Sequence, residues 1–268
     1  SLGVVGEPAP IIGMSISPDG KRAAAQLLNP SGSDIWVYDL ARGLPTRFTF
    51  AKTGTFYSAP LWSPDGREIA FANASLGEIL VKAADGSSSD RGVFTGPSAN
   101  REPDSWAPDG SLISVRIQSG NSYDEWIVPV DKQGEARAFI ATPASEYSGR
   151  FSPDGKWFSY VSHESGHGEL YVVPFPGPGG KWQVSSDGAR DGYWLGRGLG
   201  ILYQTQEGRL TAVELQATGA NLQIGEPRTL LGGTSLRDSY AVAPDGSRLL
   251  VAMSAGQTGT PTLNLVVN

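Results

Sequence analysis

Short runs in which apolar and polar residues alternate recur along the whole chain, and turn-forming residues separate them. One stretch shows the pattern well, with apolar runs at 61–63, 68–71, 78–81 and 91–94 and with Pro, Asp, Gly and Ser between them. An alternation with a period of two, bounded by such residues, is typical of β-strands rather than helices. We therefore expect short strands joined by tight turns throughout the sequence.

A four-residue turn motif marks each repeat of this pattern. Ser-Pro-Asp-Gly or Ala-Pro-Asp-Gly occurs at 17–20, 63–66, 107–110, 152–155 and 243–246. The prolines of successive copies lie 46, 44, 45 and 91 residues apart, so one copy is missing from the last, doubled interval. In its place, 193–200 reads Tyr-Trp-Leu-Gly-Arg-Gly-Leu-Gly, which keeps an aromatic residue and the glycines. Proline presets φ for a tight turn, Asp bonds the backbone ahead of it and Gly adopts positive φ.

Six repeats of four antiparallel strands predict an all-β, six-bladed β-propeller that forms a single domain over residues 1–268. The sixth repeat ends one strand short, while the apolar run Leu2–Val5 precedes the first repeat. We expect this run to pair with the strand at 262–267 and so to close the ring within the last blade, which removes two exposed edges. The expected blades span residues 6–50, 51–96, 97–142, 143–187, 188–232 and 233–268.

Composition agrees with this architecture and narrows the range of partners. The 268 residues include 35 Gly and 19 Pro, which suits short strands and tight turns. The net charge is −6 and no run of basic residues stands out, so nucleic acid and anionic membrane surfaces are not expected partners. No stretch approaches the roughly 20 apolar residues of a membrane-spanning helix, so no direct insertion into a membrane is expected. The chain has no Cys, which excludes disulfides, thiolate metal ligands and cysteine nucleophiles.

The segment His163-Glu164-Ser165-Gly166-His167 matches the His-Glu-x-x-His pattern of zinc proteases. That chemistry requires a helix, on which the two His share one face and the Glu acts on a metal-bound water. Here Gly166 interrupts the motif and predicted strands flank it, so we expect a hairpin loop. These are the only two His of the chain, and no Gly-x-Ser-x-Gly motif occurs. We therefore predict no catalytic residue, no metal site and no cofactor.

Two pairs of nearby carboxylates leave an enzymatic alternative open. Asp124 with Glu125, and Glu102 with Asp104, supply the residue type that acts in general acid–base catalysis. A glycosidase needs two such carboxyls opposed across a cleft at a set separation, which a sequence does not reveal. The alternative is therefore a carbohydrate- or peptide-processing propeller enzyme with a carboxylate pair at the mouth of the channel.

Residues that recur at one position of the repeat are expected to be structural. The large rings of Trp62, Trp106 and Trp194 occupy one such position and are predicted to pack between blades. The aspartates of the turn motif are expected to stabilise the turn rather than to bind a ligand. These aspartates are Asp19, Asp65, Asp109, Asp154 and Asp245.

In a propeller, the loops that lead into the first strands gather on one face around the central channel, where binding residues vary without disturbing the core. Charged and aromatic side chains from five blades are expected there. In the simplest interpretation they pair with each other and with water, and in the functional one they bind a ligand. Such a mixed rim suits a protein segment, a peptide or a small polar molecule. The candidate ligand-binding residues are Tyr57, Arg101, Glu102, Glu146, Tyr147, Arg190, Asp191, Arg237, Asp238 and Tyr240.

The sequence also carries the motifs of a known group of propellers. Trp-Ser-Pro-Asp-Gly at 62–66, followed by Ile-Ala-Phe at 69–71, resembles the repeat of TolB-like (WD40-like) propellers, over essentially the full length. A closer resemblance, to the propeller that follows the membrane span in certain bacterial serine/threonine kinases, involves 151–157, 164–166, 169–172 and 174–185. This resemblance implies a non-catalytic sensor or protein-interaction domain located outside the cytoplasm, in the periplasm or at the cell surface. The chain has no kinase motif, so it would be the propeller alone.

Overall fold

The computed structural model describes residues 2–5, 9–95, 100–131, 135–196, 199–219, 221–231, 240–243, 245–246, 248–254 and 261–267. Within these ranges the chain is all-β, and its strands pair in antiparallel sheets without any helix. These ranges accordingly contain no helix long and apolar enough to cross a membrane. The chain divides into two compact units, Ser1–Pro103 with Ser235–Asn268, and Asp104–Thr234.

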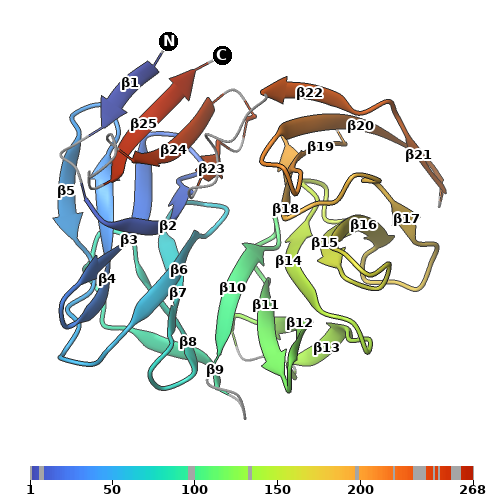
Figure 1. The fold of residues 1–268 in the computed structure, drawn as a ribbon. Helices are drawn as coiled ribbons and strands as arrows, with labels where there is room; N and C mark the ends of the chain where they lie inside the picture. Colours follow the sequence, from blue (N-terminus) through green and yellow to red (C-terminus); the bar gives the residue numbers. More distant parts are fainter. Residues whose placement is uncertain are drawn as a thin grey trace. The chain divides into compact units, whose positions relative to one another are not determined.

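The first unit holds three four-stranded sheets (Figure 1). Two of them follow chain order, whereas the third combines the first strand of the chain with the last three. The sheets are β2 (Ile11–Ile16), β3 (Arg22–Asn29), β4 (Gly32–Asp39) and β5 (Leu44–Arg47); β6 (Tyr57–Trp62), β7 (Glu68–Asn73), β8 (Glu78–Ala83) and β9 (Arg91–Thr95); and β1 (Leu2–Val5), β25 (Pro261–Val267), β24 (Arg248–Ser254) and β23 (Tyr240–Val242).

The second unit also holds three sheets, and the first residues of β10 precede its boundary. Its last sheet has a fifth strand, β22 (Arg228–Leu231), which pairs with β20 beside β21. The sheets are β10 (Arg101–Trp106), β11 (Leu112–Ser119), β12 (Ser122–Pro129) and β13 (Arg137–Ile140); β14 (Glu146–Phe151), β15 (Trp157–Ser162), β16 (Glu169–Pro174) and β17 (Trp182–Gln183); and β18 (Asp191–Leu195), β19 (Gly200–Gln204), β20 (Leu210–Thr218) and β21 (Asn221–Ile224) with β22.

A recurrent set of hydrogen bonds explains why Ser-Pro-Asp-Gly joins the first two strands of a sheet. Between β6 and β7, the Ser63 hydroxyl donates to the Asp65 carboxylate (2.7 Å) and accepts a bond from the Glu68 amide (2.9 Å). Gly66 has φ +70°, which glycine adopts without strain. The hydrogen bonds from Ser63 and from a backbone amide lower the pKa of Asp65, because they stabilise its charged form. The same two side-chain bonds occur in the copies at 17–22 and 152–157. In these copies the turn aspartate is structural, as predicted.

The first strands of two sheets carry a β-bulge at the same repeat position. The pairing register shifts between Ser58 and Leu61 in β6, and between Tyr147 and Arg150 in β14. Within each bulge one residue with a side chain has positive φ, 49° at Ala59 and 59° at Ser148. Such a conformation is uncommon outside glycine. A bulge takes backbone groups out of the ladder, so the amide that follows Ser148 is available to a side chain.

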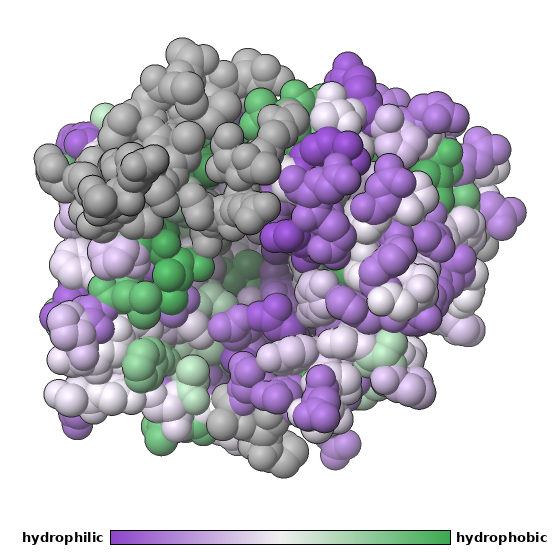
Figure 2. Space-filling model, in the orientation of Figure 1, coloured by the Kyte–Doolittle hydropathy of each residue, from purple (hydrophilic) through white to green (hydrophobic). Residues whose placement is uncertain are grey.

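Apolar side chains from facing sheets form the core of each unit. Ile35, Phe48, Trp62 and Phe71 belong to one such cluster in the first unit. Trp62, Trp106 and Trp194 are all buried, which confirms the prediction that they are core residues. In the right-hand part of Figure 2 hydrophilic residues predominate, and hydrophobic residues occur in small groups.

The two ends of the chain pair with each other. Strand β1 lies antiparallel to β25, with Leu2 opposite Val266 and Val5 opposite Leu263 (Figure 1). The predicted pairing of these segments is therefore confirmed. A closed ring of six blades stays a prediction.

Deleting residues 1–6 is expected to lower the melting temperature. The deletion removes β1 and leaves the edge of β25 without its hydrogen-bond partner, which also creates an edge prone to aggregation. Scanning calorimetry of the deletion variant, with removal of Ser1 alone as the control, checks this prediction. Equal melting temperatures for the two variants would contradict a stabilising role of β1.

The Ser63→Ala substitution is expected to cost about 1–2 kcal/mol of unfolding free energy, because the partly buried Glu68 amide loses its acceptor. Ser87→Ala is a matched control: the Ser87 hydroxyl bonds Asp85 in the same way, but on an exposed turn. Urea unfolding measures both variants. Because charged Asp65 accepts the Ser63 bond, the loss in Ser63→Ala should shrink as the pH falls through the lowered pKa of Asp65. A loss no larger than that of the control would contradict this account of the turn.

Candidate functional site

Glu125 occupies a position that other repeats give to an aliphatic core residue. In four sheets the third strand carries an acidic residue directly before this position. The four pairs are Asp34–Ile35, Glu78–Ile79, Asp124–Glu125 and Glu169–Leu170, and the second residue of each pair occupies the position. All four of these following side chains are fully buried. Because burying an isolated charge is costly, a carboxyl group at such a position must be neutral or specifically partnered.

The buried Glu125 interacts with the carboxyl group of Asp104, which is half-buried and lies on the first strand of the same sheet. Glu125 Oε1 accepts a hydrogen bond from the Gly149 amide (2.7 Å). Glu125 Oε2 and Asp104 Oδ2 are buried and find no N–H or O–H donor among the described residues. Two acceptor oxygens attract each other only when one of them carries a proton. Burial first, and then the Asp104 charge, raise the pKa of Glu125 well above its usual value, which favours the protonated form of Glu125.

The backbone at Gly149 is shaped to receive Glu125. A Cβ atom at position 149 would lie 2.4 Å from Glu125 Oε2 and 2.6 Å from Phe158 Cζ, so no side chain fits there. The bulge at Ser148 frees the Gly149 amide from the strand ladder, and this amide bonds Glu125. Glycine at position 149 and the carboxyl at position 125 therefore require each other.

Arg150 links three sheets of the second unit. Its Nη1 donates to the Asp104 carbonyl (2.9 Å), and its guanidinium lies 3.9 Å from the centre of the Tyr193 ring, a cation–π contact. Trp194 Nε1 in turn donates to the Arg150 carbonyl (3.1 Å). These bonds connect β10, β14 and β18, so the backbone beside the carboxyl pair is held from both sides.

The solvent-accessible part of this region centres on Tyr147. Its side chain is half-buried, and its hydroxyl lies 3.1 Å from Nε2 of the exposed His163. Burial, followed by the Asp191 charge, raises the pKa of Tyr147, while Arg116 and Arg190 act in the opposite direction. Tyr147 is therefore surrounded by charges of both signs. The same Arg116 also acts on Glu125, so the accessible and buried parts are electrostatically connected. We call the whole set the second-unit polar network: Asp104, Arg116, Glu125, Tyr147, Arg150, Arg190, Asp191 and Tyr193.

The structure brings together three of the predicted ligand-binding residues, Tyr147, Arg190 and Asp191. Glu146 does not share their environment. It is fully buried and accepts hydrogen bonds from Thr142 and Ser162, which is a structural arrangement.

The predicted residues of the first unit that the structure describes are buried or half-buried. Tyr57 is half-buried and packs edge-on against Phe71, at 5.5 Å between ring centres. Arg101 is 1% exposed and lies over the Phe94 ring, and Tyr240 is also buried. Glu102 is half-buried. Arg237 and Asp238 lie outside the described residues.

The His-Glu-x-x-His segment forms the turn between β15 and β16, as predicted. His163 contacts Tyr147, whereas His167 Nδ1 lies 3.2 Å from Glu169 Oε1. Within the described ranges, no group of three His, Asp or Glu side chains has the arrangement of a metal site.

Sequence reasoning missed Arg116, Arg150 and Tyr193 and paired the carboxylates differently. It placed Asp124 with Glu125 and Glu102 with Asp104, whereas the structure pairs Asp104 with Glu125. A signal for Glu125 was present, because alignment of the repeats sets it against Ile35, Ile79 and Leu170. No comparable pattern marks Asp104, whose partner lies two strands away.

Comparison with known proteins identifies the kind of repeat. The family profile described as TolB beta propeller domain matches residues 59–267. An uncharacterized peptidase, YuxL of Bacillus subtilis (strain 168), is 27% identical over 193 residues, which are 63% of this chain and 28% of that protein. The chain thus spans little more than a quarter of this relative.

Solved structures share the fold. A putative TolB from Agrobacterium tumefaciens has a TM-score of 0.65 at 18% identity, covering 90% of this chain and 88% of that chain. TolB from Acinetobacter baumannii has a TM-score of 0.61 at 17% identity, covering 96% and 63%. A β-propeller domain from Myceliophteria thermophila has a TM-score of 0.71 at 9% identity, covering both chains fully. At these identities the likeness concerns the fold alone.

The Glu125→Gln variant should remove a pH dependence of stability. The unfolded chain releases the Glu125 proton near the usual pKa of 4.5, whereas the folded chain keeps it to a higher pH. Above pH 4.5 the folded state therefore binds more protons, so wild-type stability falls as the pH rises towards the raised pKa. The Gln amide can donate to Asp104 at every pH, so the variant should lack this fall.

Urea unfolding between pH 4 and 8 checks this expectation, with Glu207→Gln on the exposed surface of the same unit as the control. The control should follow the wild-type curve. A Glu125→Gln curve parallel to that of the wild type would show that Glu125 is charged in the folded protein.

Proposed function

This chain belongs to the TolB β-propeller domain family, and on that premise we propose that it is a non-catalytic module that senses or binds a ligand. The ligand is a protein segment, a peptide or a small polar molecule. The observation that carries the proposal is the arrangement around Tyr147, where an accessible phenol and charges of both signs stand on a fixed support.

The chemistry of this region suits polar recognition. Tyr147 and Arg190 offer hydrogen-bond donors, and the Asp191 carboxylate offers acceptors, so all groups needed to bind peptide bonds and charged termini are present. The side chains extend from strands that Arg150 and Trp194 hold together. A preorganised site loses less entropy on binding, which favours recognition of small or flexible ligands.

Burial of the carboxyl pair favours binding over catalysis. A glycosidase needs its two carboxyls about 5 Å or more apart and in reach of the substrate. The Asp104 and Glu125 carboxyls instead lie close enough for Asp104 to raise the pKa of Glu125, and Glu125 has no exposed surface. We therefore assign this pair the task of holding the strands in place. A carbohydrate- or peptide-processing enzyme is the alternative. The similarity to the peptidase YuxL, of which this chain spans 28%, supports it.

The specific form of the proposal is the sensor domain of a bacterial membrane serine/threonine kinase. It rests on the resemblance of 151–157 and 174–185 to the propellers of such kinases. On this proposal the domain lies outside the cytoplasm, in the periplasm or at the cell surface. Its partners are proteins, peptides or small polar molecules rather than nucleic acid, in keeping with the net charge of −6, and it does not itself insert into a membrane.

A thermal-shift screen of peptides, cell-wall fragments, sugars and divalent ions tests the proposal. A compound that raises the melting temperature is then titrated against the Tyr147→Phe and Arg190→Gln variants. We expect each variant to bind about tenfold more weakly, because one charge-assisted or phenolic hydrogen bond is lost, while circular dichroism shows that it still folds.

The control is Arg209→Gln, which removes an exposed cation of the same unit that pairs with Glu207. It should bind like the wild type. Turnover of a glycan or peptide that Asp104→Asn or Glu125→Gln abolishes would overturn the proposal in favour of the enzymatic alternative.

A further inference from the structure

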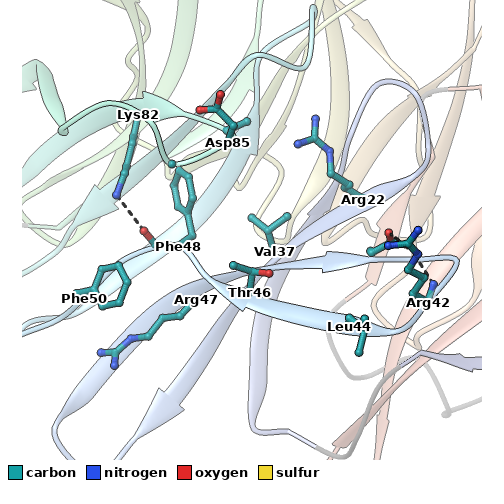
Figure 3. A pocket seen from close by; sticks show the side chains of 13 residues that line it. Arg22, Val37, Arg42, Leu44, Thr46, Arg47, Phe48, Phe50, Lys82 and Asp85 are labelled. Atoms are coloured by element: carbon teal, nitrogen blue, oxygen red, sulfur yellow. Dashed lines mark hydrogen bonds and ion pairs between the residues drawn. The ribbon is translucent and has the colours of Figure 1, made fainter.

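A pocket of about 550 Å³ lies in the first unit, where the sheet of β2–β5 meets the sheet of β6–β9 (Figure 3). Its volume is that of a site for a small organic ligand. Residues of β3, β4, β5 and β8 line it, together with residues of the segments that follow β4, β5 and β8. It shares no residue with the second-unit polar network.

The lining of this pocket has a charge opposite to that of the chain. Four cationic residues line it, Arg22, Arg42, Arg47 and Lys82. The acidic lining residues are only two, Asp39 and Asp85. The protein as a whole carries a net charge of −6. A cluster of cations on an acidic protein makes a local field that attracts anions.

Both acidic lining residues are engaged in their own turns. Asp39 Oδ1 accepts hydrogen bonds from the amides of Ala41 and Arg42. Asp85 Oδ1 accepts bonds from the amide and the hydroxyl of Ser87, and these bonds lower the pKa of Asp85. Their charges stabilise the turns, and they also balance part of the positive charge, because Asp39 Oδ2 lies 4.0 Å from Arg42 Nε and Arg22 helps to lower the pKa of Asp85.

Three of the cations are held in fixed positions. Lys82 Nζ donates to the Phe48 carbonyl (3.0 Å) and lies 3.7 Å from the Asp90 carboxylate, and the Lys82 side chain is only 12% exposed. Arg47 pairs with the buried Asp34 (2.7 Å), and Arg22 donates to the Gly66 carbonyl while lying over the Trp62 ring. An anion that binds here need not order long, mobile side chains, so the entropic cost of binding is reduced.

Apolar groups accompany the charges. Val37 and the buried Phe48 ring contribute to the lining, and Phe50 and Leu44 flank it with 69% and 61% of their surfaces exposed. In Figure 3, Phe50 lies towards one end of the pocket with Arg47 and Lys82, and Leu44 towards the other with Arg42. Exposed apolar side chains beside cations suit a ligand that has both an apolar body and an acidic group.

We propose that this pocket binds a small organic anion, with its carboxylate or phosphate held by the cationic rim and its apolar body against Phe48 and Phe50. Arg22 and Arg42 supply donors at one end of the pocket, and Arg47 and Lys82 supply them at the other. A rim that merely solvates the surface would interact with every anion weakly and equally. The proposed site instead requires the charge and the apolar body together.

Isothermal titration calorimetry with four probes separates these possibilities. Phenyl phosphate and benzoate carry both features, inorganic phosphate carries the charge alone, and benzyl alcohol carries the ring alone. We expect saturable binding of one phenyl phosphate or benzoate per chain, at least about tenfold tighter than either single-feature probe. The stronger of the two ligands identifies phosphate or carboxylate as the preferred group.

Substitutions then locate the site. Arg22→Gln combined with Arg42→Gln should weaken phenyl phosphate binding about tenfold or more, and Phe50→Ala should weaken it without changing the interaction with inorganic phosphate. Arg67→Gln is the control, because Arg67 is 86% exposed and does not line the pocket. Because Arg42 and Phe50 are largely exposed, circular dichroism should show that the variants fold.

Three results would overturn the proposal. The first is that neither phenyl phosphate nor benzoate binds saturably at millimolar concentration. The second is that the Arg22/Arg42 double variant binds phenyl phosphate as tightly as the Arg67→Gln control does. The third is that inorganic phosphate binds as tightly as phenyl phosphate. None of them bears on the proposed function, since the probes and variants involve a different unit of the chain.

Discussion

The hydrogen bonds of the Ser-Pro-Asp-Gly turn determine where the second strand of a sheet begins. The register of the strands that follow in the repeat depends on that starting point. Ser63 and Ser152 each bind the turn aspartate and the first amide of the next strand in the same way. Because a shift by one residue would move every side chain to the other face of the sheet, this turn also determines which residues are buried. Trp62 beside one copy and Phe151 beside another are both buried as a result.

Once the register is set, a polar residue at a core position needs partners of its own. Glu125 stands where other repeats have Ile or Leu, and three features of the second unit accommodate it: the Asp104 carboxyl, the Gly149 amide and the absence of a side chain at position 149. The bulge at Ser148 makes the amide available. The bonds from the Gly149 amide to Glu125 and from Arg150 to the Asp104 carbonyl hold the neighbouring strands together. Here the rigid region adjoins Tyr147, so the exposed side chains that would contact a ligand stand on a fixed base.

Much of the fold was predictable from the sequence because the repeat appears in the spacing of single residues. The period of the prolines indicated sheets of four strands, and the apolar run Leu2–Val5 indicated the pairing with the last strand that the structure contains. The candidate site was predictable only in part. Residues at the start of a first strand were expected to face solvent, yet Glu146 and Arg101 are buried. The bulges explain part of this difference, since an extra residue changes the face of the sheet on which a side chain lies. No residue type in the sequence predicts a bulge at Ala59 or Ser148. Asp104 and Glu125 come together only because their strands lie in one sheet, so their positions along the chain were not enough to predict the pair.

The central claim is that ligands bind at the accessible part of the second-unit polar network without being transformed. Hydrogen–deuterium exchange, measured with and without a compound that stabilises the protein, tests it most directly because it locates binding and leaves the compound available for analysis. The account predicts slower exchange at 145–149, 163–168 and 189–192 and an unchanged compound at the end of the experiment. Slower exchange confined to other segments, or a compound that is cleaved during the incubation, would contradict it.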